Sequence, residues 1–303
     1  MAGFISEFFG YRSEDKSNAA LSAAASNTCP FLGDMCVKTL SRSNEYSGVC
    51  SIRQKTPGSP DVICCPIRLY SDGYRMLYEI SRMAFKKECS LYAGRTAVEK
   101  ARNEGGAIAV FGKGWGKELH LPQRKGIGSY FVDWVLAKLD ENGNLEEFTV
   151  IEVQTIDTTG NYRTARKALL DRRDIVYDSV GLNWENVSKR IIPQLIYKGQ
   201  VLQREDLCRT GLFFVAPNPI YSRVIDRLGG KDKLPVFPPQ PASIHFISYD
   251  RIENIKFTDG AIIPLGVIER HSTTVYKVQE SFSSLNLPEG NVYRDALRKN
   301  LYE

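Results

Sequence analysis

Long hydrophobic runs are absent from this 303-residue sequence. No stretch approaches the ~18 consecutive apolar residues that a membrane-spanning helix requires. Residues 1–12 hold no basic segment ahead of an apolar run, which a secretion signal would need. We therefore expect a cytoplasmic protein that meets no membrane. Collagen, coiled-coil and disordered classes are also excluded, because 43% of the residues are hydrophobic and 25% are charged, as in folded globular domains.

The sequence has few histidines and a small net charge. His120, His245 and His271 are the only histidines and lie far apart in the sequence, so no histidine-based metal or catalytic centre is expected. The net charge of +5 permits a nucleic-acid partner without requiring one. Positive charge is concentrated in residues 161–210, which hold ten Lys or Arg against six Asp or Glu.

Cysteine is distributed unevenly. Cys29, Cys36, Cys50 and Cys65 fall within 37 residues, and Cys64 lies in the same stretch. A chain without a secretion signal keeps its thiols reduced, so such a cluster favours a metal site over disulfides. A tetrahedral thiolate site suits iron and zinc equally well. Cys64 stands beside Cys65 and leaves the fourth ligand open, whereas the isolated Cys89 and Cys208 are expected to be small buried residues.

Residues 1–69 are predicted to form a small N-terminal module and residues 70–303 the main domain. Prolines and glycines interrupt residues 1–66, so we expect irregular structure held by a metal rather than long helices. In the main domain, the hydrophobic periodicity predicts a mixed α/β fold of the α+β type. The predicted helical segments are 70–104 (with a second helix over 95–103) and 161–205, and the predicted strands are 107–111, 130–139, 148–156, 212–215 and 244–248.

Two of these strands carry acids that a hairpin would bring together. Asn142-Gly143 is the strongest short hairpin signal. A two-residue loop there places Asp133 directly opposite Glu152, with Cβ atoms ~4.5–5.5 Å apart, and Gln154 on the same face. Two carboxylates this close need a cation between them, and oxygen ligands suit Mg²⁺. The alternative is a solvated cross-strand pair, in which one acid is protonated or each faces a Lys or Arg.

Asp133 followed by Glu152-Val153-Gln154 resembles the PD-(D/E)xK nuclease signature. Gln154 stands where most members have lysine, and Val132 where a proline often precedes the aspartate. Over roughly residues 4–215, the sequence resembles the NotI family of type II restriction endonucleases. The matching segments include Glu7-Phe8-Phe9-Gly10, Thr28-Cys29-Pro30-Phe31-Leu32, Cys36-Val37-Lys38, Gly48-Val49-Cys50, Cys65-Pro66, Asp133-Trp134, Glu152-Val153-Gln154-Thr155 and Tyr197-Lys198.

The resemblance implies a nuclease core, with a central mixed sheet flanked by helices, and an N-terminal four-cysteine module. It also implies a homodimeric prokaryotic enzyme that cleaves both strands of palindromic double-stranded DNA with Mg²⁺. A companion methyltransferase would act on the same DNA site. The structural metal of the module, iron or zinc, would be bound by Cys29, Cys36, Cys50 and Cys65.

For catalysis, we expect Asp133, Glu152 and the backbone carbonyl of Val153 to bind Mg²⁺, which activates water for attack on the scissile phosphodiester. Gln154 cannot act as a base, but its amide can orient the water or the phosphate. Two other functions stay open. One is a nuclease of the same superfamily that acts in DNA repair or recombination, and the other is a DNA-binding module without catalysis.

Phosphate contacts are expected from the basic residues that follow the acids in the sequence. The candidates are Arg163, Arg166, Lys167, Arg172, Arg173, Lys189 and Arg190. For each of them the alternative is an exposed helix face that contacts only water.

Overall fold

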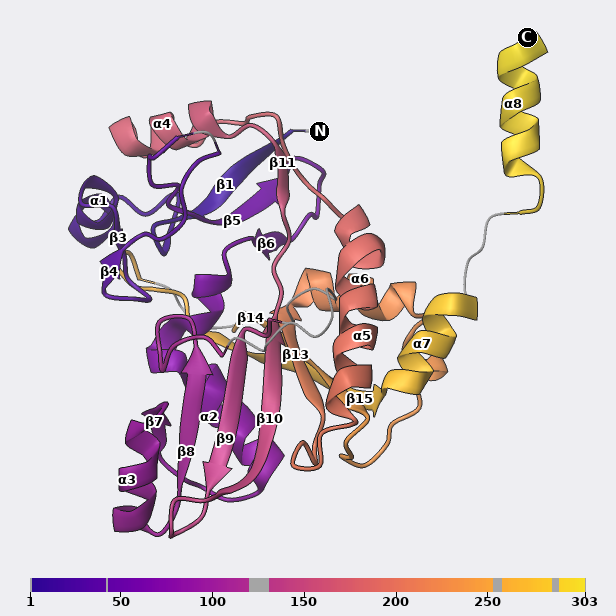
Figure 1. Ribbon diagram of the computed structural model, residues 1–303. Coiled ribbons are helices and arrows are strands. Elements are labelled where there is room, and N and C mark those ends of the chain that lie inside the picture. The colour runs from indigo at the N-terminus through magenta and orange to yellow at the C-terminus, as the bar shows by residue number, and fades with distance from the viewer. Residues whose placement is uncertain (1, 42, 120–130, 253–257, 285–288, 303) are drawn as a thin grey trace.

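A seven-stranded mixed sheet forms the centre of the fold, with strand order β15-β14-β13-β10-β9-β8-β7. The computed structural model describes residues 2–41, 43–119, 131–252, 258–284 and 289–302 (Figure 1). The strands are β7 (Leu91–Ala93), β8 (Ala107–Gly112), β9 (Trp134–Leu139), β10 (Leu145–Val153), β13 (Leu212–Pro217), β14 (Ser243–Arg251) and β15 (Leu265–Thr274). Because β10, β13 and β14 run parallel, their carboxyl ends meet at one edge of the sheet.

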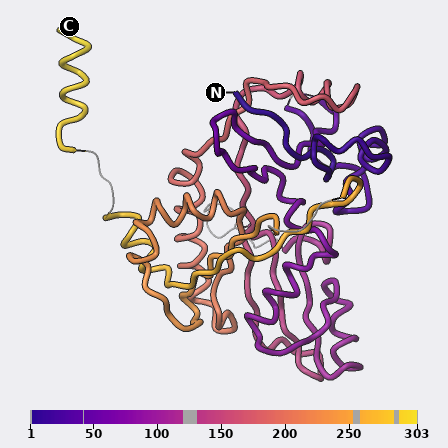
Figure 2. The backbone as a smooth tube through the Cα atoms, turned by 180° about the vertical axis from the view of Figure 1, so that it is seen from behind, coloured from indigo at the N-terminus to yellow at the C-terminus, as the bar shows by residue number. Residues whose placement is uncertain are grey.

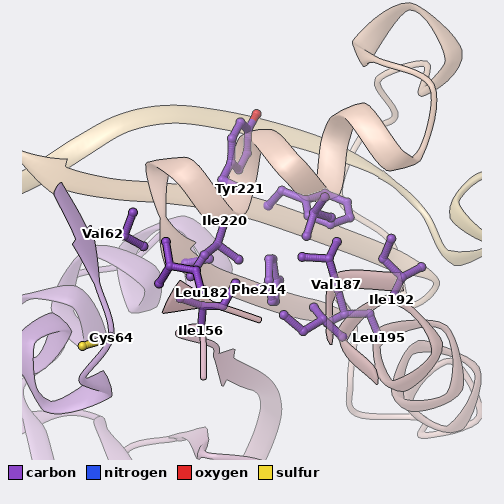
Figure 3. Packing of buried hydrophobic residues seen from close by; sticks show 14 of the residues in the cluster. Val62, Cys64, Ile156, Leu182, Val187, Ile192, Leu195, Phe214, Ile220 and Tyr221 are labelled. Carbon is purple, nitrogen blue, oxygen red and sulfur yellow. The ribbon is translucent and has the colours of Figure 1, made fainter. Parts of the chain in front are cut away.

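Helices cover both faces of this sheet, because alternate residues of its strands point to opposite sides. On one face, Phe213 and Val215 pack in the same cluster as α2 (Ser71–Phe85). On the other face, Leu212 and Phe214 share a cluster with three later helices (Figure 3). These are α5 (Ile192–Leu202), α6 (Asn218–Arg227) and α7 (Val275–Ser284), while α3 (Thr96–Glu104) covers β8 and β9.

The N-terminal segment forms a sheet of its own, so the expectation of irregular structure over residues 1–66 was wrong. Its strand order is β2-β1-β5-β6, with α1 and the short β3-β4 pair beside it. The bounds are β1 (Gly3–Phe8), β2 (Tyr11–Arg12), α1 (Asn18–Ala25), β3 (Thr28–Cys29), β4 (Asp34–Met35), β5 (Val49–Gln54), β6 (Asp61–Ile63) and the 3-10 helix η1 (Pro66–Tyr70). Every residue of β1 is buried, so this strand shows no apolar–polar alternation that sequence reasoning could detect.

A buried carboxylate, Glu7, connects this N-terminal sheet to the rest of the chain. Arg68 Nε lies 2.8 Å from Glu7 Oε1, and both side chains are fully buried. Ser51 donates a hydrogen bond to Glu7 Oε2 over 2.8 Å. Arg251, at the end of β14, approaches the same carboxylate to 3.5 Å. Residues from both sheets therefore stabilise one carboxylate.

The region 161–205 is less helical than predicted. It contains α4 (Arg163–Arg172), the π-helix η2 (Val187–Ile191) and α5, but strand β12 (Val180–Leu182) interrupts them and pairs with β11 (Thr158–Gly160). The interruption follows from residues 174–183, where β-branched residues and Gly181 disfavour a helix. Over 70–104 the predicted helices are confirmed as α2 and α3, but strand β7 lies between them, so the range is not helical throughout. The five predicted strands are confirmed as β8, β9, β10, β13 and β14.

The C-terminal helix α8 (Val292–Tyr302) lies apart from the other elements in both views (Figures 1 and 2). It buries none of its residues, although Tyr293, Leu297 and Leu301 place large apolar groups along it. The sequence showed no pattern there and also gave no prediction for β15, α6, α7 or the 3-10 helix η3 (Lys231–Lys233). Within the described residues, none of the helices is long and apolar enough to cross a membrane.

The hairpin of β9 and β10 has the predicted register but a different loop. Asp140 N donates to Asn144 O over 2.9 Å, which leaves a loop of three residues rather than two. A bulge then follows between Leu145 and Glu147. The extra residue of the loop and the extra residue of the bulge offset each other. From Glu147 onward the pairing is therefore the one that a two-residue loop predicts, up to Ile151 opposite Trp134.

Candidate active site

Asp133 and Glu152 lie at the edge of the sheet where β9 begins and β10 ends. Each is the next residue beyond the last pair of the two strands, Trp134 and Ile151. Asp133 Oδ2 accepts a hydrogen bond from Val153 N over 2.7 Å. Burial and the nearby charge of Glu152 raise the pKa of Asp133 to about 7. The two acids thus act on each other electrostatically, as close carboxylates do.

Gln154 lies beside Glu152 at the end of β10. Its Nε2 donates a hydrogen bond to Glu152 Oε1 over 2.9 Å. Its backbone N donates to Val215 O over 2.9 Å, which continues the pairing of β10 with β13. The amide is therefore held next to the acids by the ends of two parallel strands.

Lys198 completes this group, and sequence reasoning gave it no role. It comes from α5, and its Nζ lies 2.6 Å from Glu152 Oε2, with 14% and 5% of the two side chains exposed. The only sequence signal was the Tyr197-Lys198 match to the family. The contact is an ion pair without hydrogen-bond geometry, because Glu152 Oε2 is buried and accepts no hydrogen bond.

Two observations bear on a metal at the acid pair. Glu152 Oε2 is a buried carboxylate oxygen whose charge faces the Lys198 ammonium at 2.6 Å, and Asp133 lies close enough for the charge of Glu152 to raise its pKa. This donor set fits a hard divalent cation such as Mg²⁺. Across the ranges that the structure describes, however, no three His, Cys, Asp or Glu side chains are placed as a ready metal site. Water or DNA oxygens would have to complete the coordination.

An open pocket of about 760 Å³ is lined by Asp133, while Glu152 and Lys198 are not among its lining residues. The main domain lines it with Asp133, Val153, Gln154, Lys113 and Arg190, among others. The N-terminal segment contributes further lining residues, namely Lys38, Cys64, Cys65, Pro66 and Ile67. The pocket is therefore shared between the two sheets, and three of its lining residues are basic.

The four clustered cysteines line one small cavity, but among the residues that the structure describes they are not grouped closely enough to form a ready metal site. Cys29, Cys36, Cys50 and Cys65 all line it, and its volume is about 10 Å³, close to the space that one water molecule needs. Cys64 does not line this cavity but faces the larger pocket. Burial raises the pKa of the Cys29, Cys50 and Cys65 thiols, that of Cys65 to about 12, so without a metal these thiols are protonated at neutral pH.

The seven residues predicted to contact phosphate differ in their burial and location. Of the seven, only Arg190 lines the large pocket. Arg166 is buried, bonded to Tyr46 O over 2.6 Å and paired with Glu45. Arg173 is also buried and donates to Ala20 O and Arg12 O. Both guanidinium groups are thus engaged with the N-terminal segment. The remaining four, Arg163, Lys167, Arg172 and Lys189, are exposed.

Comparison with known families gives one match. A family model described as "Restriction endonuclease NotI" matches residues 14–208, more than half of the chain. The matched range contains the four cysteines of the cavity, Asp133, Glu152, Gln154 and Lys198. No curated protein matches the chain.

Proposed function

The chain belongs to the NotI family of restriction endonucleases, which are type II site-specific deoxyribonucleases, and we propose that it cleaves both strands of a palindromic DNA duplex by Mg²⁺-dependent hydrolysis. The observation that carries this proposal is the acid pair at the strand ends, in which Glu152 is buried and Asp133 is half-buried at a pocket lined by both acidic and basic residues. A close pair of like charges is costly in a sheet. Such a pair of carboxylates is useful where a cation has to be bound next to a phosphodiester.

Asp133, Glu152 and the Val153 carbonyl would hold Mg²⁺, which when bound lowers the pKa of water and polarises the phosphate. Gln154 is kept beside Glu152 by its 2.9 Å hydrogen bond, so its amide can orient the attacking water or a phosphate oxygen. In the reaction, the water oxygen would form a bond to phosphorus and give up one proton to the solvent. The P–O3′ bond breaks, and its electron pair leaves with the 3′ oxygen, which takes up a proton.

We propose that residues 1–69 form a structural module that binds iron or zinc through Cys29, Cys36, Cys50 and Cys65. Their arrangement around one cavity of about 10 Å³ supports this ligand set. Because Cys65 lines this cavity and Cys64 does not, the arrangement supports Cys65 as the fourth ligand. Metal binding would release the thiol protons and draw the four sulfur atoms together.

For DNA binding, we propose that Arg190 contacts the phosphate backbone inside the pocket, together with Lys38 and Lys113. The exposed Arg163, Lys167 and Lys189 would extend this contact outside it. A palindromic site has twofold symmetry, so a homodimer would bring one acid pair to each strand. A companion methyltransferase that modifies the same site would protect the host DNA.

The test is cleavage of plasmid DNA by the purified protein with and without Mg²⁺. We expect discrete bands with Mg²⁺ and intact DNA without it. Asp133→Asn should abolish cleavage and retain DNA binding, because it removes one metal ligand and no basic group. Asp226→Asn, at an exposed acid of α6, is the matched control and should cut normally.

Each alternative outcome has a definite meaning. A smear in place of discrete bands would indicate a nuclease without site specificity, as in repair or recombination. Binding without any cutting by the unmodified protein would indicate a DNA-binding module. Cleavage by Asp133→Asn at the normal rate would show that the acid pair is not the active site.

A further inference from the structure

Lys198 is the one residue that forms an ion pair with either acid within the part of the chain that the structure describes. Its Nζ lies 2.6 Å from Glu152 Oε2. Only 14% of the lysine side chain is exposed, so the ammonium is held away from bulk water. An ionic contact in such surroundings is stronger than one at the surface.

The packing of α5 fixes the position of Lys198. Leu195 and Leu202, on either side of it along the helix, are buried in the cluster that contains Phe214 of the central sheet. Gly199 lets α5 approach α7 closely, since a Cβ there would lie 2.9 Å from Val275 Cγ2. The backbone of Lys198 is therefore constrained on two sides, while its long side chain keeps the freedom to turn at its end.

The charges of the site favour a positively charged side chain such as Lys198. Two carboxylates and an incoming phosphodiester are all negative, and Gln154 is neutral. A divalent cation on Asp133 and Glu152 would take over the role of balancing the acids. The ammonium of Lys198 would then be released from Glu152 and become available to the next negative group, which is the phosphate of bound DNA.

We propose that Lys198 is a catalytic residue, whose Nζ donates a hydrogen bond to a non-bridging oxygen of the scissile phosphate. This inference rests on the proposed function and adds a residue to it. The extra negative charge that the phosphate oxygens gain when water attacks would be stabilised by Lys198, which supplies the positive charge that Gln154 lacks. In the other reading, Lys198 only neutralises a buried acid and takes no part in the reaction.

The two readings differ at saturating Mg²⁺. We would measure single-turnover cleavage of a plasmid site over a range of Mg²⁺ concentrations for the unmodified protein, Lys198→Met and Lys198→Arg. Calorimetric titration with Ca²⁺ would measure cation affinity without turnover. Lys277→Met, on α7 with an exposed partner Glu280, is the control for loss of a lysine elsewhere.

If Lys198 is catalytic, Lys198→Met lowers the rate at saturating Mg²⁺ by about 100-fold or more, as loss of a transition-state donor does. Cation affinity stays equal or rises, because a competing positive charge is gone. Lys198→Arg recovers part of the lost rate, since it keeps the charge but changes the geometry. Lys277→Met cuts as the unmodified protein does.

A rate for Lys198→Met that returns to normal at saturating Mg²⁺ would overturn the proposal. Should this variant fail to fold, Lys198→Gln compared with Lys198→Arg decides in the same way, and equal rates for those two would overturn it. Failure of the proposed nuclease function would be recognised by a different result, because the unmodified protein would then not cleave the DNA.

Discussion

At the scale of single residues, burial decides which side chains keep their charge. His245 shows this away from the candidate active site. Its Nε2 donates to Thr210 O over 2.8 Å, and its Nδ1 lies 2.7 Å from Ser272 Oγ, which donates to it in the neutral tautomer. Burial lowers the pKa of this imidazole. The neutral ring is therefore favoured by burial, since both ring nitrogens have hydrogen-bond partners in either protonation state.

This predicts a pH dependence of stability. In the unfolded chain His245 takes up a proton near pH 6.5, whereas the folded form resists it, so the unfolded state binds more protons as the pH falls below about 6.5. The contribution of the neutral ring is full above that pH and is lost below it. Urea unfolding of the protein and of His245→Gln between about pH 5 and 7.5 should show a shallower acid-side fall for the variant. Parallel curves would contradict the assignment.

At the scale of elements, the sequence predicted what depends on local pattern. The periodicity located α2, α3 and five strands of the central sheet, and the register of the hairpin brought Asp133 toward Glu152. The sequence missed β1 because it is buried throughout, and it missed the contact of Lys198 with Glu152 because 46 positions separate them. Packing between distant segments sets such contacts, and no local pattern encodes it.

The turn of the β9–β10 hairpin gives a second prediction. Gly143 has a φ of +81°, and a Cβ there would lie 2.9 Å from Val98 Cγ1. Gly143→Ala should therefore lower the free energy of unfolding by about 1–2 kcal/mol for the left-handed backbone, with a further loss from the contact. Gly58→Ala has a similar φ of +75° with open space around it and is the matched control. Equal losses in urea unfolding would show that α3 does not constrain the turn.

At the scale of the whole molecule, the N-terminal segment and the main domain share one interior. Ile5 and Phe8 of β1 belong to the same buried cluster as Val150 of β10 and Leu195 of α5. The large pocket is lined from both parts as well. Damage to the cysteine cavity should therefore reach the candidate active site.

This makes metal removal a test of the whole fold. We expect about one iron or zinc ion per chain by elemental analysis, and none in Cys50→Ser. That variant should melt about 5–10 °C lower, the shift expected from a loss of a few kcal/mol in a protein of this size, and should lose cleavage in parallel. Cys89→Ser, which lies outside the cavity, should keep its metal and its melting temperature. A metal-free chain that melts and cuts normally would contradict the structural role.

The bulge in β10 also determines how the family can vary. Without Glu146, the same three-residue loop would still bring Glu147 opposite Lys138, the partner it has now. The tip of the hairpin can therefore lose one residue while the acids stay together. Homologous chains that lack one residue at this tip are therefore expected to keep Asp133 opposite Glu152, whereas loss of one residue within the paired part of either strand would shift the two acids out of register.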